Sequence, residues 1–204
     1  MTIKRTGLFV FLLSLFLFPA PALTGGVFEK IESELSRLLT VKARFEQEVP
    51  LPGTGVTRRA TGHVYVSRSE GSLWDYESPT PQAYLILGDK VYFREGKEGE
   101  FRETRVPAEA TRLFEVLLGG RGKLSDLMMA GRDKIDDSGR VELELIPRGE
   151  MERAAKKVVV LWDPRARVVE EVSVYSPAGL TNRVRFFDVE KNVPIPEVLF
   201  RIRK

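Results

Sequence analysis

The sequence of 204 residues contains no cysteine and only one histidine, His63. Without cysteine the chain has no disulfide bond, no thiolate metal site, no thiol nucleophile and no lipidated cysteine to tether an exported protein to a membrane. His63 lies in a strand-like run with no serine or cysteine motif beside it, so nothing supports Ser-His-Asp catalysis or a histidine-rich metal site. The sequence therefore predicts no bound metal.

Long hydrophobic runs are also scarce. The longest, "LFVFLLSLFLF" over residues 8–18, is much shorter than the roughly 20 residues that a membrane-spanning helix needs. Two basic residues precede this run, and Ala20 and Ala22 follow it with the small-x-small spacing that signal peptidase recognises. We predict a cleavable signal peptide over residues 1–22, in preference to a membrane anchor, and therefore export to a periplasm.

A strong charge of either sign is missing as well. The formal net charge is +3, and loss of the two basic residues of the leader lowers it to +1. Acidic and basic residues are interspersed, whereas a nucleic-acid-binding protein would gather lysine and arginine on one face. We predict no nucleic-acid partner. The mature part, residues 23–204, has the length of one ordinary domain, and no repeat divides it.

Motifs for chemistry are few. The segment "GGRGK" (residues 119–123) lacks the first glycine and the final serine or threonine of a phosphate-binding loop. Acidic residues in i, i+2 pairs could in principle run glycoside hydrolysis, but on alternating strands such pairs share a solvent-exposed face. The sequence predicts neither an enzyme nor a cofactor.

Periodicity indicates many strands and few helices. The spacing of Val27, Phe28, Ile31, Leu35 and Leu38 is that of an amphipathic helix over residues 27–39. Alternation of apolar and polar residues then predicts strands separated by turns rich in glycine and proline. The expected strands cover residues 41–49, 60–66, 73–76, 83–87, 90–94, 100–105, 141–146, 157–162, 167–175, 181–188 and 198–202, and short helices are expected at 109–118 and 124–130.

This count predicts a mainly β protein of the α+β class, with about 10–11 strands in one large curved antiparallel sheet. So many strands cannot stay flat, and the few helices must cover the apolar concave face that results. The aromatic and aliphatic residues exceed what one leading helix can cover, and the methionines Met128 and Met129 suit apolar ligands of varied shape. Either all of these residues fill the core, or they leave a lipid-sized pocket between sheet and helices.

Several motifs, taken in order, resemble the LolA family of outer-membrane lipoprotein carrier proteins. They are "ARFEQ", "GHVYVSR", "LWDYESP", "LGDKVYF" and "VLFRI", and the family positions fall on Phe45, Gln47, Gly62, Arg68, Trp74, Tyr76, Pro79, Gly88 and Tyr92. Ser69 stands where the family usually has a proline after the arginine. The resemblance spans nearly the whole mature chain.

The resemblance implies an unclosed half-barrel whose hollow is lidded by the N-terminal and central helices. It also implies a monomeric periplasmic carrier that takes acylated lipoproteins from an inner-membrane ATP-driven release complex and delivers them to an outer-membrane acceptor lipoprotein. A periplasmic sensor of lipid or envelope stress with the same fold is the alternative. A periplasmic enzyme or polysaccharide-binding module is the other class that stays open.

Two groups of candidate site residues follow from the resemblance. Arg68 is expected to fasten the helical lid through hydrogen bonds to backbone carbonyls, a task for which the five donors of a guanidinium are suited. An ordinary solvated arginine at a strand end is the alternative. Residues expected to bind lipid, with alternate ones facing away from the hollow, are Leu73, Trp74, Tyr76, Leu85, Leu87, Phe93 and Met128.

Overall fold

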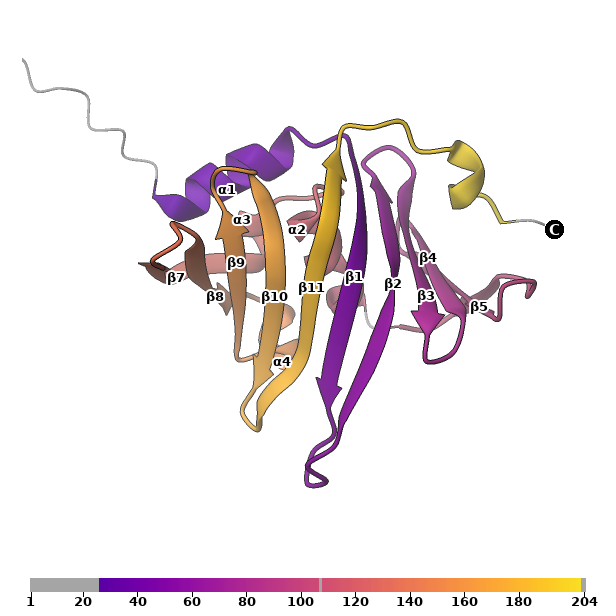
Figure 1. Cartoon of the computed structure of the whole chain (residues 1–204), viewed down its shortest axis with the longest axis horizontal. Helices are drawn as coiled ribbons and strands as arrows, with labels where there is room; N and C mark the ends of the chain where they lie inside the picture. Colours follow the sequence, from indigo (N-terminus) through magenta and orange to yellow (C-terminus); the bar gives the residue numbers. More distant parts are fainter. Residues whose placement is uncertain (1–25, 107, 203–204) are drawn as a thin grey trace, which may run out of the picture.

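Eleven strands form one antiparallel sheet in the computed structural model, which describes residues 26–106 and 108–202 (Figure 1). Their order across the sheet is β6-β5-β4-β3-β2-β1-β11-β10-β9-β8-β7, so β6 and β7 are free edges and the sheet is not closed. The predicted fold class is confirmed, whereas the predicted signal peptide lies outside the described residues. The strands are β1 (Thr40–Pro50), β2 (Thr57–Ser67), β3 (Gly71–Ser78), β4 (Gln82–Leu87), β5 (Lys90–Glu95), β6 (Arg102–Thr104), β7 (Met128–Ile135), β8 (Val141–Pro147), β9 (Lys157–Asp163), β10 (Val168–Ser176) and β11 (Gly179–Lys191).

Helices cover the concave face of this sheet. They are α1 (Val27–Ser36), α2 (Ala108–Leu117), α3 (Leu124–Leu127) and α4 (Met151–Ala154). Figure 1 shows α2, α3 and α4 behind the sheet and α1 along its upper edge. Buried residues of these helices, such as Ile31 and Leu113, join Phe45, Val160 and Phe186 of the strands in one core. Among the described residues, no helix is both long enough and apolar enough to span a bilayer.

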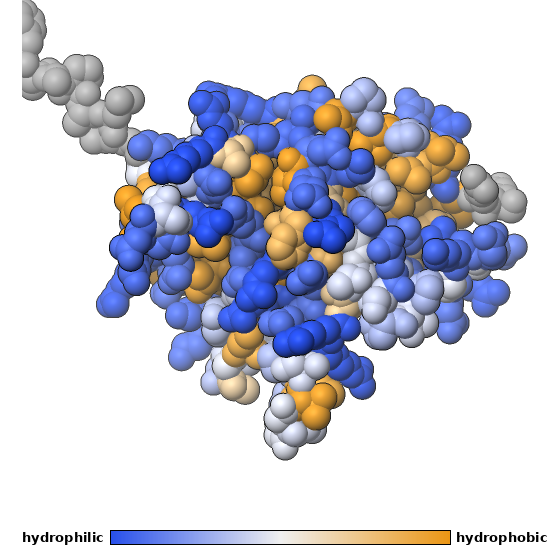
Figure 2. Space-filling view, in the orientation of Figure 1, coloured by the Kyte–Doolittle hydropathy of each residue, from blue (hydrophilic) through white to orange (hydrophobic). Residues whose placement is uncertain are grey.

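The outer face of the sheet is mostly hydrophilic, but hydrophobic residues gather beside the C-terminal segment (Figure 2). There, Leu73, Ala83 and Leu85 form a second apolar cluster with Phe200. Phe200 belongs to η1, a 3-10 helix over Glu197–Phe200, so the expected strand over residues 198–202 is wrong. Prolines precede this segment and limit backbone hydrogen bonding, and burial of Phe200 fixes it on the outside of β3 and β4.

The region around Met128 also differs from expectation. The predicted helix over residues 124–130 ends at Leu127, and Met128 begins β7, which was not predicted. A register shift between Ala130 and Asp133 interrupts the pairing of β7 with β8, and this irregularity hides the period of two in the sequence. The number of strands therefore agrees with the prediction although one strand was missed and another was wrongly assigned.

Gly62 allows close packing between β2 and β3. It lies opposite Phe45 on β1 and beside a register shift in the pairing with β3. A Cβ atom at this position would lie 2.2 Å from the carbonyl oxygen of Asp75, closer than atoms can approach. Phe45 is fully buried next to it, with edge-to-face contacts to Trp74 and Tyr76 at centroid distances of 5.1 and 4.9 Å.

We expect Gly62→Ala to lower the free energy of unfolding by about 1–3 kcal/mol, because the added methyl group forces β3 away from β2. Urea denaturation followed by circular dichroism measures the change. Arg58→Ala, at an exposed position of the same strand, is the control and should change stability by less than about 0.5 kcal/mol. Equal stability of Gly62→Ala and wild type would show that β3 does not need this close approach.

Candidate functional site

A cavity of about 830 Å³ lies between the concave face of the sheet and α2. This volume falls in the range of roughly 300–1,000 Å³ that small-molecule sites occupy. The wall comes from β1 to β4 and from β11, and the cover comes from α2 and the residue Val106 before it. Apolar and aromatic lining residues are Val49, Leu51, Trp74, Tyr76, Tyr84, Ile86, Val106, Phe114 and Val184.

Aromatic rings form one continuous wall of the cavity. Trp74 contacts Phe114 of α2 at a centroid distance of 5.6 Å, so the wall reaches the helix that covers it. Tyr76 packs edge-to-face on Tyr84 at 6.0 Å, and Tyr84 packs on Phe93 at 5.1 Å. These contacts between protein side chains fix the rings of the wall relative to one another.

Three of the polar side chains that line the cavity are paired with each other. The Tyr76 hydroxyl donates to Oε1 of Gln47 at 2.9 Å, and Nε2 of Gln47 donates to Oδ1 of Asn182 at 3.0 Å. Burial raises the pKa of Tyr76 above its ordinary value, so this hydroxyl stays neutral. Since these donors and acceptors already satisfy one another, the cavity offers a ligand mainly apolar surface.

The hairpin between β1 and β2 borders the mouth of the cavity. Its tip projects beyond the rest of the sheet at the bottom of Figure 1 and carries Val56, which is 54% exposed. Arg58 and Arg59 lie behind the tip and line the cavity. Arg59 pairs with Glu48 at 3.3 Å. The entrance is therefore basic and amphipathic, while the interior is apolar.

Two arginines attach the helices to the turn between β2 and β3. Arg68 donates from Nε to the carbonyl oxygen of Leu38 and from Nη2 to that of Leu35, each at 2.8 Å. Both acceptors lie at the C-terminal end of α1, where a cation also interacts favourably with the helix dipole. Arg121, which follows α2, donates to the carbonyl oxygens of Arg68 and Ser69. One turn thus holds the ends of both helices.

A family model described as "Outer membrane lipoprotein carrier protein LolA" matches residues 36–203. The chain belongs to the LolA family. A carrier of this name from Chromohalobacter salexigens is 34% identical over 73 residues, which are 36% of this chain and 34% of that protein. The match thus spans about a third of the length of this curated relative.

Solved structures share the fold at low sequence identity. An uncharacterized conserved protein from Thermus thermophilus superposes with a TM-score of 0.53 at 9% identity, over 86% of this chain and 91% of that one. A LolA superfamily protein from Nitrosomonas europaea has a TM-score of 0.47 at 12% identity, over 85% and 97% of the two chains. Identities this low describe the fold alone.

The predicted lipid-binding residues of this LolA-family chain fall in three places. Trp74 and Tyr76 line the cavity, and Phe93 lies behind Tyr84 on the same wall. Met128 lies at the junction of α3 and β7. It is fully buried in the main core there and does not line the cavity. Its role is therefore corrected from ligand contact to core packing.

Leu73, Leu85 and Leu87 lie on the other face of the sheet, in the outer cluster with Phe200. They are the members of the predicted lipid-binding set that face away from the hollow. Successive side chains of a strand point to opposite faces of the sheet. Trp74 and its neighbour Leu73 therefore cannot both face the cavity. Both faces of β3 and β4 are apolar, and apolar character alone could not identify the face that holds the cavity.

Sequence reasoning missed several lining residues. Tyr84 could have been found, because it pairs directly with Trp74 across β3 and β4 and therefore shares its face. Val49 continues the alternation of Phe45 and Gln47 along β1. Phe114 of α2 and Val184 of β11 come from distant parts of the chain, and no local pattern places them at the cavity.

Tyr76→Phe removes the hydroxyl that donates to Gln47, and we expect the free energy of unfolding at pH 7 to fall by about 1–2 kcal/mol. The deficit should shrink as the pH rises above about 10, the ordinary pKa of tyrosine. There the unfolded wild-type chain ionises while the folded one, with its raised pKa, does not, so the wild type loses stability that the variant keeps.

Urea denaturation at pH 7 and near pH 10.5 measures both effects. Tyr175→Phe, at a half-exposed tyrosine of β10, is the matched control. A difference between Tyr76→Phe and wild type that does not change with pH would contradict the assignment of a buried neutral hydroxyl.

Proposed function

We propose that this LolA-family chain is a periplasmic carrier that holds the acyl chains of lipoproteins in the cavity beneath α2. The observation that carries the proposal is a mainly apolar, aromatic-walled space of about 830 Å³, in which Tyr76, Gln47 and Asn182 are paired with one another. Such a space binds hydrocarbon chains by excluding water and offers a charged or strongly polar substrate little compensation for lost hydration.

The energetics explain why acylated cargo needs a carrier. Burial of each methylene group contributes about 0.8 kcal/mol, so a lipoprotein with long acyl chains does not cross water unaided. A monomeric carrier takes its cargo from an inner-membrane ATP-driven release complex and gives it to an outer-membrane acceptor lipoprotein. Membership of the LolA family supports these partners, and the amphipathic mouth near Arg58 and Val56 is the proposed place where cargo enters and leaves.

Arg68 acts in this proposal as the latch of the closed state. Its two hydrogen bonds hold the end of α1 against the turn between β2 and β3. Hydrogen bonds of a charged group contribute about 1.5–3 kcal/mol each when well formed. Cargo that displaces α1 must break them, and their return on release favours departure of the cargo.

A charge placed in the cavity should weaken binding of acyl chains. We expect Val49→Asp to weaken binding of a tripalmitoylated lipopeptide at least tenfold, because the carboxylate must lose its hydration beside hydrocarbon. Val49 is half-buried, so the folded structure should be retained. Val198→Asp, at an exposed valine of η1 outside the lining, is the matched control and should bind like wild type.

Displacement of an environment-sensitive apolar dye measures these affinities, with circular dichroism to verify the fold. A folded wild-type protein that binds neither dye nor lipopeptide would eliminate the carrier function. Equal loss of affinity in both variants would place the acyl site outside this cavity.

Replacement of the latch should separate loading from delivery. We expect Arg68→Leu to load lipopeptide as well as wild type or more tightly, because opening no longer breaks the two hydrogen bonds. We expect it to deliver several-fold less lipopeptide to vesicles that carry the acceptor lipoprotein, because these bonds no longer re-form to favour release. Arg68→Lys keeps the charge without the planar fork and should fall between the two. Equal delivery by wild type and Arg68→Leu would show that this arginine is not the latch, and a protein that loads but never delivers would be a lipid sensor.

A further inference from the structure

The charged side chains that line the cavity of about 830 Å³, called here the large cavity, all have the same sign. Among the described residues that line it are two arginines, Arg58 and Arg59, and no aspartate or glutamate. The other lining residues are apolar, or are uncharged polar residues such as Gln47 and Asn182. The entrance therefore carries a positive charge that no acidic residue of the lining offsets.

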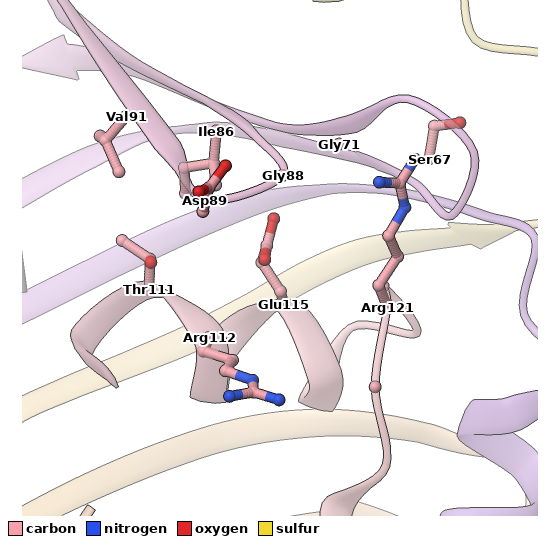
Figure 3. Close-up of a pocket in the computed structure, with 12 residues that line it drawn as sticks. Ser67, Gly71, Ile86, Gly88, Asp89, Val91, Thr111, Arg112, Glu115 and Arg121 are labelled. Carbon is pink, nitrogen blue, oxygen red and sulfur yellow. The ribbon is translucent and has the colours of Figure 1, made fainter. Parts of the chain in front are cut away.

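A second, smaller cavity lacks this imbalance. It has a volume of about 300 Å³ and lies between α2 and the turns that follow β2 and β4 (Figure 3). Asp89 and Glu115 line it together with Arg112 and Arg121. Figure 3 shows Glu115 pointing from α2 toward the sheet and Arg112 pointing away from it. Acidic and basic side chains balance there, so a purely basic lining is particular to the large cavity.

Arg58 lies on the cavity side of β2. It pairs with Val49 of β1 and precedes Ala60 by two residues, and both of these residues line the large cavity. Because side chains alternate along a strand, the side chain of Arg59 points to the outer face of the sheet, where its Nε lies 3.3 Å from Oε1 of Glu48. Arg58 is therefore the cation that is directed at the entrance of the large cavity.

The guanidinium of Arg58 has no ion-pair or hydrogen-bond partner in the described part of the chain. Glu48, on the outer face of β1, is already engaged by Arg59 and Arg183. A guanidinium presents a planar set of donors that suits the oxygens of phosphates and carboxylates. Acyl chains joined through amide or ester bonds bring no charge, so the lipoprotein cargo proposed above supplies no anion for Arg58.

We propose that the large cavity also binds anionic lipids, with the acyl chain against the aromatic wall and the anionic group at Arg58. The chemistry required is a hydrocarbon chain that ends in a phosphodiester or a carboxylate. The cavity binds the chain by excluding water, whereas the anionic group stays hydrated at the entrance and selects the ligand by its charge. This ligand class is additional to the proposed lipoprotein cargo, and it requires only that the cavity holds hydrocarbon.

Three ligands with one palmitoyl chain each test the preference. They are lysophosphatidylglycerol with a phosphodiester, palmitate with a carboxylate and monopalmitoylglycerol without charge. Dye displacement on the purified protein, at concentrations below micelle formation, gives each affinity. We expect wild type to bind lysophosphatidylglycerol about three- to tenfold more tightly than monopalmitoylglycerol, a gain between that of an exposed ion pair and that of a buried charged hydrogen bond. The same gain for palmitate would extend the site to anions in general, and a gain for the phospholipid alone would assign it to phosphodiesters.

Variants of Arg58 assign the preference to one side chain. Arg58→Gln should bring the affinities for lysophosphatidylglycerol and monopalmitoylglycerol within twofold of each other, whereas Arg58→Lys should keep most of the preference because the charge remains. Raising the salt concentration from about 0.05 M to about 0.5 M should reduce the preference of wild type and not that of Arg58→Gln, since salt screens an exposed ion pair. Arg132→Gln removes the same charge from an exposed position of β7 outside the lining, so it is the matched control and should prefer anionic ligands as wild type does.

Tryptophan fluorescence locates the bound chain. Lysophosphatidylglycerol brominated in its acyl chain should quench Trp74, which lines the large cavity, whereas the other tryptophan, Trp162 of β9, does not line it. Trp74→Phe should therefore lose most of the quenching. Quenching that persists in folded Trp74→Phe would place the lipid outside the cavity. Binding to phosphatidylglycerol vesicles without binding of the monomeric lipid would make Arg58 a contact to a membrane surface, and either result overturns the proposal.

The anionic-lipid site and the carrier function fail separately. If wild type binds the tripalmitoylated lipopeptide and monopalmitoylglycerol but does not prefer anionic ligands, the anionic-lipid site is wrong while the carrier function stands. If wild type prefers lysophosphatidylglycerol but does not bind the lipopeptide, the carrier function fails and the site stands. A preference that survives in folded Arg58→Gln would contradict the role of Arg58.

Discussion

An open sheet of eleven strands has an apolar concave face that water must not reach, and this chain has few helical residues with which to cover it. The short helices pack tightly over part of the face and join the main core there. Over β1 to β4 the cover is α2 alone, and the space left between Trp74 and Phe114 and their neighbours is the large cavity. The cavity is thus a consequence of incomplete cover, and its apolar lining is core that lacks a protein partner.

The hydrogen bonds that attach α1 and the loop after α2 to the sheet are as specific as the aromatic contacts of the cavity wall. Arg68 and Arg121 use backbone carbonyls as acceptors, at the end of α1 and in the turn between β2 and β3. The last carbonyls of a helix lack the partners that carbonyls in its interior have. The guanidinium of Arg68 supplies a donor to the carbonyl oxygen of Leu38 and a second donor to that of Leu35, which also accepts the backbone N–H of Leu38. Glu32 makes a further link, since its carboxylate accepts the backbone N–H of Ser125 at 2.7 Å and joins α1 to α3. The helices are therefore linked to one another and to one turn by a small number of polar contacts.

The sequence predicts the sheet well because alternation is a local signal with a strict period. It fails where the period is broken, at the bulge after Ala130 in β7, and where alternation is present without a neighbouring strand, at Val198 to Phe200. The site is predicted less well, for a physical reason. Leu73 and Trp74 are equally apolar neighbours on β3, and only the position of α2 and of the C-terminal segment decides which of them faces the cavity.

The C-terminal segment gives the two sides of the large cavity different mechanical properties. Phe200 and its neighbours pack on the outer face of β3 and β4, behind the aromatic wall, with Leu85 and Trp74 on opposite sides of the sheet. Close-packed side chains on the outer face oppose bending of these strands. The aromatic side is therefore a supported wall, whereas the opposite side of the cavity is a single helix, α2. Under the proposed carrier function, the helical side adjusts to differences in cargo size, while the aromatic surface keeps its shape.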